Sequence, residues 1–351
     1  MVEQRKLVSL GRSSLVISLP KPWLEQNMLR QGDVLSLDVQ RDRSLVVFPG
    51  SRREREVRKI TLDVDPAENE ASTARRIIAC YLNGYREVTV ASKEVLSSAR
   101  QSAIREVARK LYMRIIESDS KKMLLTTLID ETKASVASAI HRMHLITASM
   151  YRDVLNSLKD KDAALAKTVS SIDDDVNHFC FFLLRLLRSA AIDPALGNQL
   201  DLSPIDCLDY QALTDKIEHV ADHLTNIADN IAMLVEKHQS IPDSQLKTIL
   251  AYANETLHIY DKAVKAFSSR ETARANEVIE RQERIQESDK EIASLASSTK
   301  SRNYVVVYAS CSICDSIKRI AEYATDIAEI AIDRYYEGQP QDSFEQAPPG
   351  A

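Results

Sequence analysis

Apolar residues recur with a helical period along most of the chain, and with a strand period only near its beginning. Segments 7–10 and 15–19 are short apolar runs separated by a Gly-Arg-Ser-Ser turn, which is typical of a strand, a turn and a second strand. Segment 20–29 opens with Pro-Lys-Pro-Trp, which predicts the start of a short helix. Alternation over 35–39 and the apolar run at 45–48 predict a second hairpin. The predicted order is ββαββ.

The next segment mixes both periods. Four short apolar runs predict strands and two amphipathic stretches predict helices, and the last two strands flank an Asp-Ser-Lys-Lys turn. No nucleophile–base pair and no metal-ligand spacing stand out in this segment, so it is interpreted as a structural coupler. The predicted strands are 60–64, 85–90, 114–118 and 123–128, and the predicted helices are 69–82 and 97–112.

From about residue 133 the period is helical almost throughout, and the segment repeats itself. Residues 150–158 align with residues 259–267 at an offset of 109, and the following helix repeats at an offset of 100. A nine-residue insertion in the first copy explains the change of offset, and the Pro- and Gly-containing loop 192–204 is its place. Identical residues at the offset of 100 are Asp215/Asp315, Ile217/Ile317, Ala221/Ala321, Thr225/Thr325, Ile227/Ile327 and Ala228/Ala328.

The predicted fold is therefore mainly α: two three-helix bundles preceded by a small β-rich domain and an α/β connecting domain. Seven Gly and ten Pro in 351 residues support long helices. Neither a GxGxxG nor a GxxxxGK[ST] motif is present, which argues against Rossmann and P-loop enzymes. The expected domains are 1–50, 55–130, 133–238 and 243–337, with a disordered Pro/Gln/Gly-rich tail at 338–351.

Charge divides the chain unevenly. Residues 1–60 carry 12 Lys and Arg against 7 Asp and Glu, whereas the remainder carries 34 against 44. Five cysteines in apolar surroundings fit a reducing cytoplasm. Cys311 and Cys314 form a single CxxC motif, which is interpreted as a pair of packing residues, with a metal or redox role as the alternative. No signal-peptide core is present at the beginning, and no apolar run is long enough to span a membrane. We expect a cytoplasmic protein whose two ends meet different partners.

The segment from Arg5 to Gln40 resembles the AbrB/SpoVT/MazE swapped-hairpin family, through its G-x-S-S turn, its L-P-K and its G-D-V. The resemblance implies an intertwined homodimer that binds double-stranded DNA with one basic face. A pure dimerisation module with solvated basic side chains is the alternative. The positions that match the family's DNA-binding face are Arg5, Lys6, Arg12, Ser13, Ser14 and Lys21.

The repeated third helix resembles the motif E-R-I-G-D-H-x-x-N-I-A-E of PhoU, a phosphate-transport regulator family of two three-helix bundles. Here Glu218 to Asp229 and Lys318 to Glu329 match it, and the resemblance implies a metal at the E-xxx-D positions, Glu218 and Asp222. Lys318 and Gln282 replace acidic residues in the second copy. The candidate ligands are Asp173, Glu218, Asp222, Asp229 and Glu322, whose oxygens suit Mg, Mn, Fe or Zn.

A solvated helix face is the alternative for this acidic stripe. His219 and His223 have the HxxxH spacing of a zinc site, and partial exposure or pairing with nearby carboxylates is the interpretation preferred for them. The functional hypothesis is a non-enzymatic regulator of phosphate uptake that binds DNA as a dimer. The competing hypothesis is an adaptor that never touches DNA and docks on a phosphate ABC transporter ATPase or a sensor kinase. A metallohydrolase is disfavoured because no base, nucleophile or phosphate cradle accompanies the carboxylates.

Overall fold

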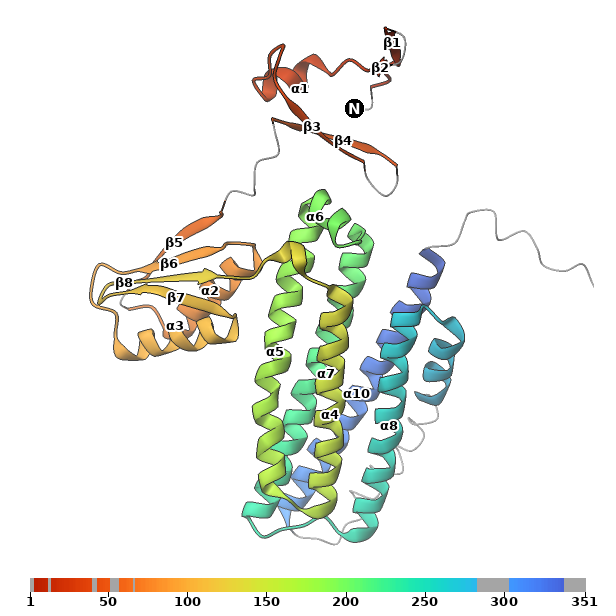
Figure 1. The fold of residues 1–351 in the computed structure, drawn as a ribbon. Coiled ribbons are helices and arrows are strands. Elements are labelled where there is room, and N and C mark those ends of the chain that lie inside the picture. Colours follow the sequence, from red (N-terminus) through yellow and green to blue (C-terminus); the bar gives the residue numbers. More distant parts are fainter. Residues whose placement is uncertain are drawn as a thin grey trace, which may run out of the picture. The chain divides into compact units, whose positions relative to one another are not determined.

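The computed structural model describes residues 3–11, 14–39, 43–50, 57–65, 67–282 and 303–337. Two compact units divide the chain, residues 1–57 and residues 58–351 (Figure 1). The predicted fold class, mainly α with a small β-rich beginning, is confirmed.

The first unit has the predicted ββαββ order. Strands β1 (Val8–Leu10) and β2 (Ser14–Val16) form one antiparallel hairpin, and β3 (Leu35–Val39) and β4 (Leu45–Pro49) form another. Helix α1 (Lys21–Gln26) lies between them in the chain and has proline in its first turn, as the sequence predicted. No described residue of this unit is buried. Two isolated hairpins are marginally stable in water, so this unit has not completed its core within one chain.

An α/β subdomain opens the second unit. Its sheet has the order β5-β6-β8-β7, with β5 parallel to β6 and the other neighbours antiparallel. Helix α2 begins after Asn69, whose side chain accepts from the Ala71 amide, and α3 begins after Ser97, which caps it in the same way. The elements are β5 (Lys59–Asp63), α2 (Glu70–Leu82), β6 (Glu87–Ala91), α3 (Ser98–Lys110), β7 (Met113–Ser118) and β8 (Lys122–Thr127).

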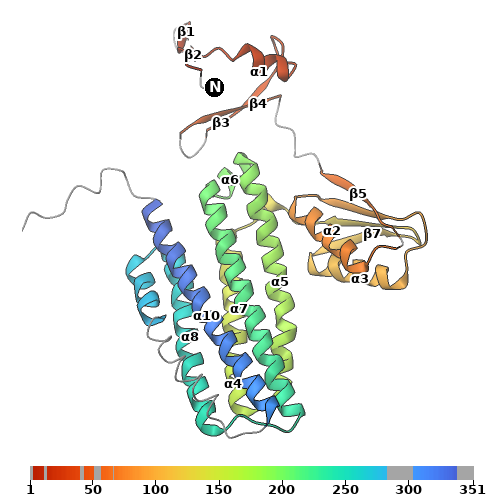
Figure 2. The same ribbon diagram turned by 180° about the vertical axis from the view of Figure 1, so that it is seen from behind.

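Long helices form the rest of the second unit, after the short 3-10 turn η1 (Glu131–Lys133) (Figures 1 and 2). Residues 272–282 are also helical. The loop that the sequence predicted between the second and third helices contains one short helix, α6, which Asp193 caps. The helices are α4 (Val136–Asp160), α5 (Ala163–Ile192), α6 (Pro194–Gln199), α7 (Pro204–Glu236), α8 (Asp243–Ser269) and α10 (Tyr304–Glu337).

The repeat seen in the sequence persists in the backbone. Helix α4 ends at Lys161 with a φ of 57°, and α8 ends at Arg270, exactly one repeat later, with a φ of 53°. Both residues are left-handed helix caps, a conformation that non-glycine residues rarely adopt. The apolar positions of α7 recur in α10 and are buried in both copies. One continuous hydrophobic core runs through both bundles.

Helix α5 joins the bundles to the α/β subdomain. The Arg185 side chain is 4% exposed and lies over the Tyr81 ring of α2, 4.8 Å from its centroid. Its guanidinium donates to the Tyr85 carbonyl at 2.9 Å and to the Glu131 carboxylate at 2.8 Å. Nearby, His178 of α5 packs on Tyr112 with ring centroids 4.3 Å apart. The subdomain is therefore fastened to the first bundle by buried polar contacts.

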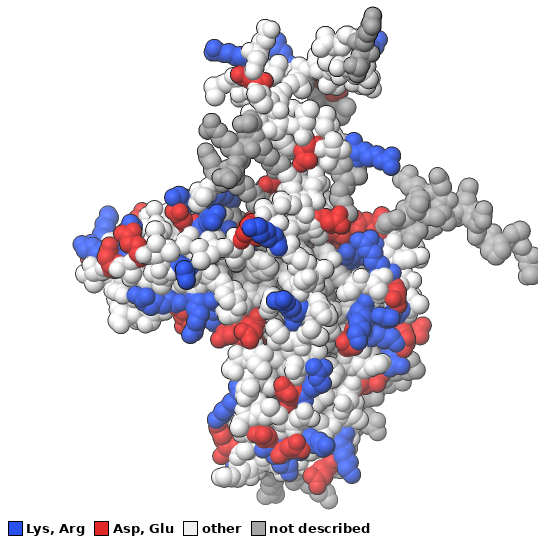
Figure 3. Space-filling model, in the orientation of Figure 1, with Lys and Arg blue, Asp and Glu red and all other residues white. Residues whose placement is uncertain are grey.

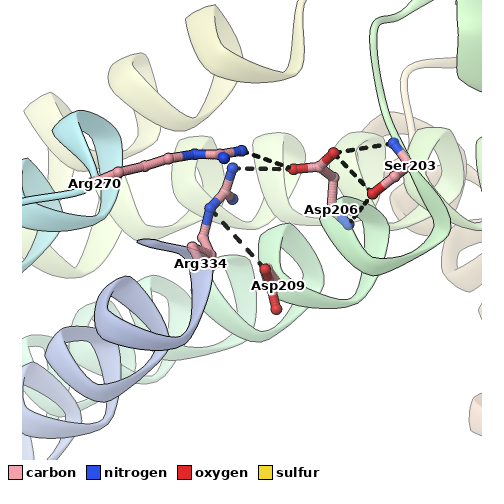
Figure 4. A network of polar contacts seen from close by, with 5 residues as sticks. All are labelled: Ser203, Asp206, Asp209, Arg270 and Arg334. Atoms are coloured by element: carbon pink, nitrogen blue, oxygen red, sulfur yellow. Dashed lines mark hydrogen bonds and ion pairs between the residues drawn. The ribbon is translucent and has the colours of Figure 1, made fainter. Parts of the chain in front are cut away.

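A second buried network connects the beginning of α7 to the second bundle (Figure 4). Asp206 forms a capping box with Ser203 and accepts from Arg334 of α10 at 3.1 Å. Arg270 approaches the same carboxylate oxygen at 3.4 Å. The Arg334 guanidinium also lies over the Phe267 ring, 4.2 Å from its centroid. Arg334 is only 4% exposed, and the Asp206 carboxylate compensates the positive charge that is buried with it.

Candidate functional site

The acidic stripe of the first bundle is built by two helices. Glu218 and Asp222 lie one turn apart on α7, and Asp173 lies on α5, which packs against α7. The apolar neighbours Ile217, Ala221 and Val176 are buried in the core. The three carboxylates occupy adjacent positions of the same helices and therefore lie at the margin of that core. The structure brings these three predicted residues close enough that the charge of Asp222 contributes to raising the pKa of both Asp173 and Glu218.

The perturbation appears in their ionisation. Partial burial, together with the neighbouring carboxylates Asp222, Asp173 and Asp215, raises the pKa of Glu218 to about 7. Partial burial and the charge of Asp222 likewise raise the pKa of Asp173 to about 6. Like charges held in partly desolvated surroundings resist ionisation, so this stripe carries unfavourable electrostatic energy at neutral pH.

Asp173 is only partly satisfied. One of its carboxylate oxygens accepts from the Asn177 side chain at 2.8 Å, whereas its other oxygen is buried without a hydrogen-bond partner. No Lys or Arg of the described residues forms an ion pair with Asp173, Glu218 or Asp222. Carboxylate oxygens with excess negative charge are the donors that a hard divalent cation prefers, so the chemistry of these side chains, though not yet their arrangement, agrees with the metal that the resemblance implies.

The other two predicted ligands lie apart from this group. Asp229 accepts from the Ser170 hydroxyl at 3.1 Å, two turns further along α7 than Asp222. Glu322 of α10 is ion-paired with Arg319 at 2.9 Å. Within the described ranges, no three His, Cys, Asp or Glu side chains are already arranged as a set of metal ligands.

The histidines of α7 face α10. The ring of His219 lies 5.4 Å from that of Tyr323, and the His223 ring lies 5.8 Å from it. The Nδ1 atom of His223 is 3.3 Å from the Ser316 hydroxyl, and His219 is 3.7 Å from the Glu218 carboxylate. His219, which is 48% exposed, agrees with the interpretation of partial exposure and carboxylate pairing, and His223 is partly exposed as well.

The cysteines are all free. Burial raises the pKa of the Cys180 thiol, and the carboxylates of Glu218 and Asp215 add to that rise. Cys80 and Cys207 are buried as well. Protonated buried thiols are poor nucleophiles, so these three residues act as packing groups.

The predicted DNA-binding residues belong to the first unit. Lys21 is exposed at the start of α1, 3.8 Å from Glu25, and Ser14 begins the exposed strand β2. Arg5 is ion-paired with Glu3 and donates to the Ser18 hydroxyl at 3.3 Å, while Lys6 is exposed. Arg12 and Ser13 lie outside the described residues.

Charge on the bundles is mixed on one face. Figure 3 shows that Lys and Arg alternate with Asp and Glu over the helices seen in that view, instead of gathering by sign. No helix in the described part of the chain is both long enough and apolar enough to cross a membrane.

The residue pattern did not predict the Arg334–Asp206 and Arg185–Glu131 networks. Arg334 and Arg185 both occupy core-facing positions of long helices, and an arginine inside an otherwise apolar stripe is the signal that could have revealed them.

Comparisons with known proteins support the two resemblances. The PhoU domain family matches residues 140–231 and 249–331, and the family described as antidote-toxin recognition MazE, bacterial antitoxin, matches residues 8–55. PhoU from Pseudomonas aeruginosa is 19% identical, with a TM-score of 0.52 over 58% of this chain and 96% of that one. The phosphate transport system regulatory protein PhoU from Streptococcus pneumoniae is 15% identical, with a TM-score of 0.50 over 58% and 94%. No curated protein matches the chain significantly.

Proposed function

The chain belongs to the PhoU family, with two PhoU domains behind a MazE-type module, and we propose that it is a phosphate-transport regulator that binds double-stranded DNA as a homodimer. The matched families suggest the two halves of this function. In this proposal the helical bundles respond to the state of phosphate uptake, and that response changes how the first unit binds DNA.

The observation that best supports dimerisation is the exposure of the first unit's apolar residues. Leu10, Leu15 and Leu37 are 65%, 67% and 63% exposed within one chain. Leaving such side chains in water costs about 1.5–3 kcal/mol each relative to burial. A second copy of the same unit, with the same hairpins and the same unpaired strand edges, is the partner best suited to cover them.

The basic side chains support the DNA half of the proposal. Dimerisation doubles the positive balance of the first 60 residues and repeats it at a fixed spacing, which suits the phosphates of a duplex. Lys21 is well placed for such a contact, since its side chain is 87% exposed and its nearest carboxylate is only a surface neighbour.

A mobility-shift titration with the full chain and duplex DNA at increasing salt tests the proposal. We expect affinity to fall steeply with salt, and Arg12→Ala with Lys21→Ala to weaken binding and flatten that dependence. Lys237→Ala, which removes a lysine of the bundles beyond the end of α7, is the matched control. If the native chain sediments as a dimer but no duplex shifts at low salt, the adaptor hypothesis of protein–protein regulation replaces this one.

A further inference from the structure

One side of helix α3 carries a row of side chains that donate hydrogen bonds to anions. The members of this row, which we call the α3 face, follow one another at spacings of four, three and four residues: Ser98, Ser102, Arg105 and Arg109. Such spacings place all four on one side of the helix, and all four are exposed. At the α-helical rise of 1.5 Å per residue, the α3 face is about 16 Å long.

The two arginines of the α3 face keep their charge free for a partner. Neither forms an ion pair with any residue that the structure describes, and Arg105 donates only to the neutral Ser118 hydroxyl, at 3.3 Å. Glu106, the one acidic residue of α3, lies 3.8 Å from Lys110 instead. The face therefore presents uncompensated guanidinium groups, whose planar donors suit phosphate oxygens.

The surroundings of the α3 face have the same sign of charge. Helix α2 packs beside α3 (Figure 2), and its exposed Arg75 also has no ion pair within the described ranges. Residues 58–130 carry 13 Lys and Arg against 10 Asp and Glu, whereas residues 131–351 carry 23 against 34. In charge, the α/β subdomain thus resembles the first unit and differs from the bundles.

We propose that the α3 face binds the phosphate backbone of the duplex that the first unit holds. The subdomain begins at Arg58, the residue that follows the first unit in the chain, so DNA bound by the first unit is at high local concentration for it. Contacts to phosphates position a protein on DNA and carry no sequence information. The α/β subdomain is then a second, sequence-independent DNA contact in addition to a structural coupler, and Arg185 of α5 ties the first bundle to it. This inference rests on the DNA binding proposed above.

Anisotropy titrations of the full chain with two labelled duplexes of unrelated sequence, at increasing salt, test the inference. We expect Arg105→Gln with Arg109→Gln to weaken binding to both duplexes equally. The slope of log K against log salt concentration should fall by about 1.8 for each chain in contact, because each lost phosphate contact is worth about 0.9. Arg105→Lys with Arg109→Lys, which keeps the charge, should restore most of that slope.

Arg114→Gln with Lys122→Gln is the matched control. It removes the same charge from the same subdomain, but on the sheet face opposite the buried Met123, and it should leave the slope unchanged. Circular dichroism checks that all variants are folded, and glutamine is a good helix former for the exposed positions of α3.

Three results would overturn the inference. In the first, the α3 variant binds as the native chain does while Arg12→Ala with Lys21→Ala still loses affinity, which leaves DNA binding standing and removes only the α3 contact. In the second, the control weakens binding as much as the α3 variant, so that net charge alone matters. In the third, the α3 variant loses binding to poly-glutamate but not to DNA, which assigns the face to an acidic protein. A native chain that binds no duplex would count against the proposed function and this inference together.

Discussion

Lys216 of α7 and Asp326 of α10 form an ion pair at 2.5 Å, and their repeat equivalents, Ser316 and Asn226, are hydrogen-bonded to each other at 2.8 Å. The position of Lys216 and Ser316 therefore contacts the position of Asn226 and Asp326 twice across the interface of the third helices. In one contact the first position comes from α7, and in the other it comes from α10. Such reciprocity is the property of an isologous interface. The two bundles of one chain pack as the two subunits of a symmetric dimer would.

The Lys216–Asp326 pair should contribute modestly to stability. Both side chains are partly exposed, at 28% and 41%, so we expect a coupling of about 0.5–1 kcal/mol. A double-mutant cycle of Lys216→Met and Asp326→Asn, measured by urea unfolding, gives that coupling. The exposed pair Lys167–Glu236 serves as the control and should couple more weakly. Equal couplings at the two sites would contradict a role of the interface in strengthening the first pair.

Arg334→Met should be strongly destabilising. The substitution leaves Asp206, whose side chain is 10% exposed, without its buried partner, and removal of one member of a buried pair costs about 3–5 kcal/mol. Arg270→Met removes a 43% exposed arginine from the same carboxylate and should cost about 1 kcal/mol or less. Guanidinium unfolding of the two variants provides the comparison, and a larger loss for Arg270→Met would refute this ranking.

The sequence predicted the elements of this fold more completely than their connections. Periodicity located nearly every helix and strand, and the offsets of 109 and 100 identified the two bundles, because the repeated Ile and Ala positions are the ones buried in both. Spacing along one helix predicted that Glu218 and Asp222 share a face, whereas Asp173 on α5 was named only through the resemblance to PhoU.

Connections between distant segments were not predictable in this way. The order β5-β6-β8-β7 depends on which strand edges meet, and the contact of Arg185 with Tyr81 joins positions 104 residues apart. Asp229 and Glu322 shared the acidic pattern with the other candidates, but each has another partner, Ser170 for Asp229 and Arg319 for Glu322. The Arg319 partner lies one turn away on the same helix, whereas a pattern along α7 contains no information about Ser170 on α5.

Arg185→Met should loosen the α/β subdomain from the first bundle. The change removes the guanidinium that bridges the mostly buried Glu131 carboxylate, the Tyr85 carbonyl and the Tyr81 ring. We expect faster amide hydrogen exchange in α2 and in the segment around η1, with exchange in α8 unchanged. Arg188→Met, which removes a single contact to Asn83 at 3.2 Å, is the matched control. Uniformly faster exchange in both variants would mean that Arg185 has no specific role in this connection.

Glu218→Gln should change how stability depends on pH in metal-free buffer. The pKa of Glu218 is raised to about 7 in the folded chain, so its proton is bound more tightly there than in the unfolded chain. Its contribution is therefore complete below its usual pKa of 4.5 and is lost as the pH rises through about 7. A neutral amide does not suffer this loss, so the Tm of Glu218→Gln should rise relative to that of the native chain as the pH rises from 4.5 to about 7, the two pKa values of Glu218. Taking the difference between the two chains removes the titration of His144 and His223, whose lowered pKa values act in the opposite direction below about pH 6.5. A Tm difference that stays constant over this range would show that Glu218 ionises normally, and the electrostatic strain assigned to the stripe would then have to be abandoned.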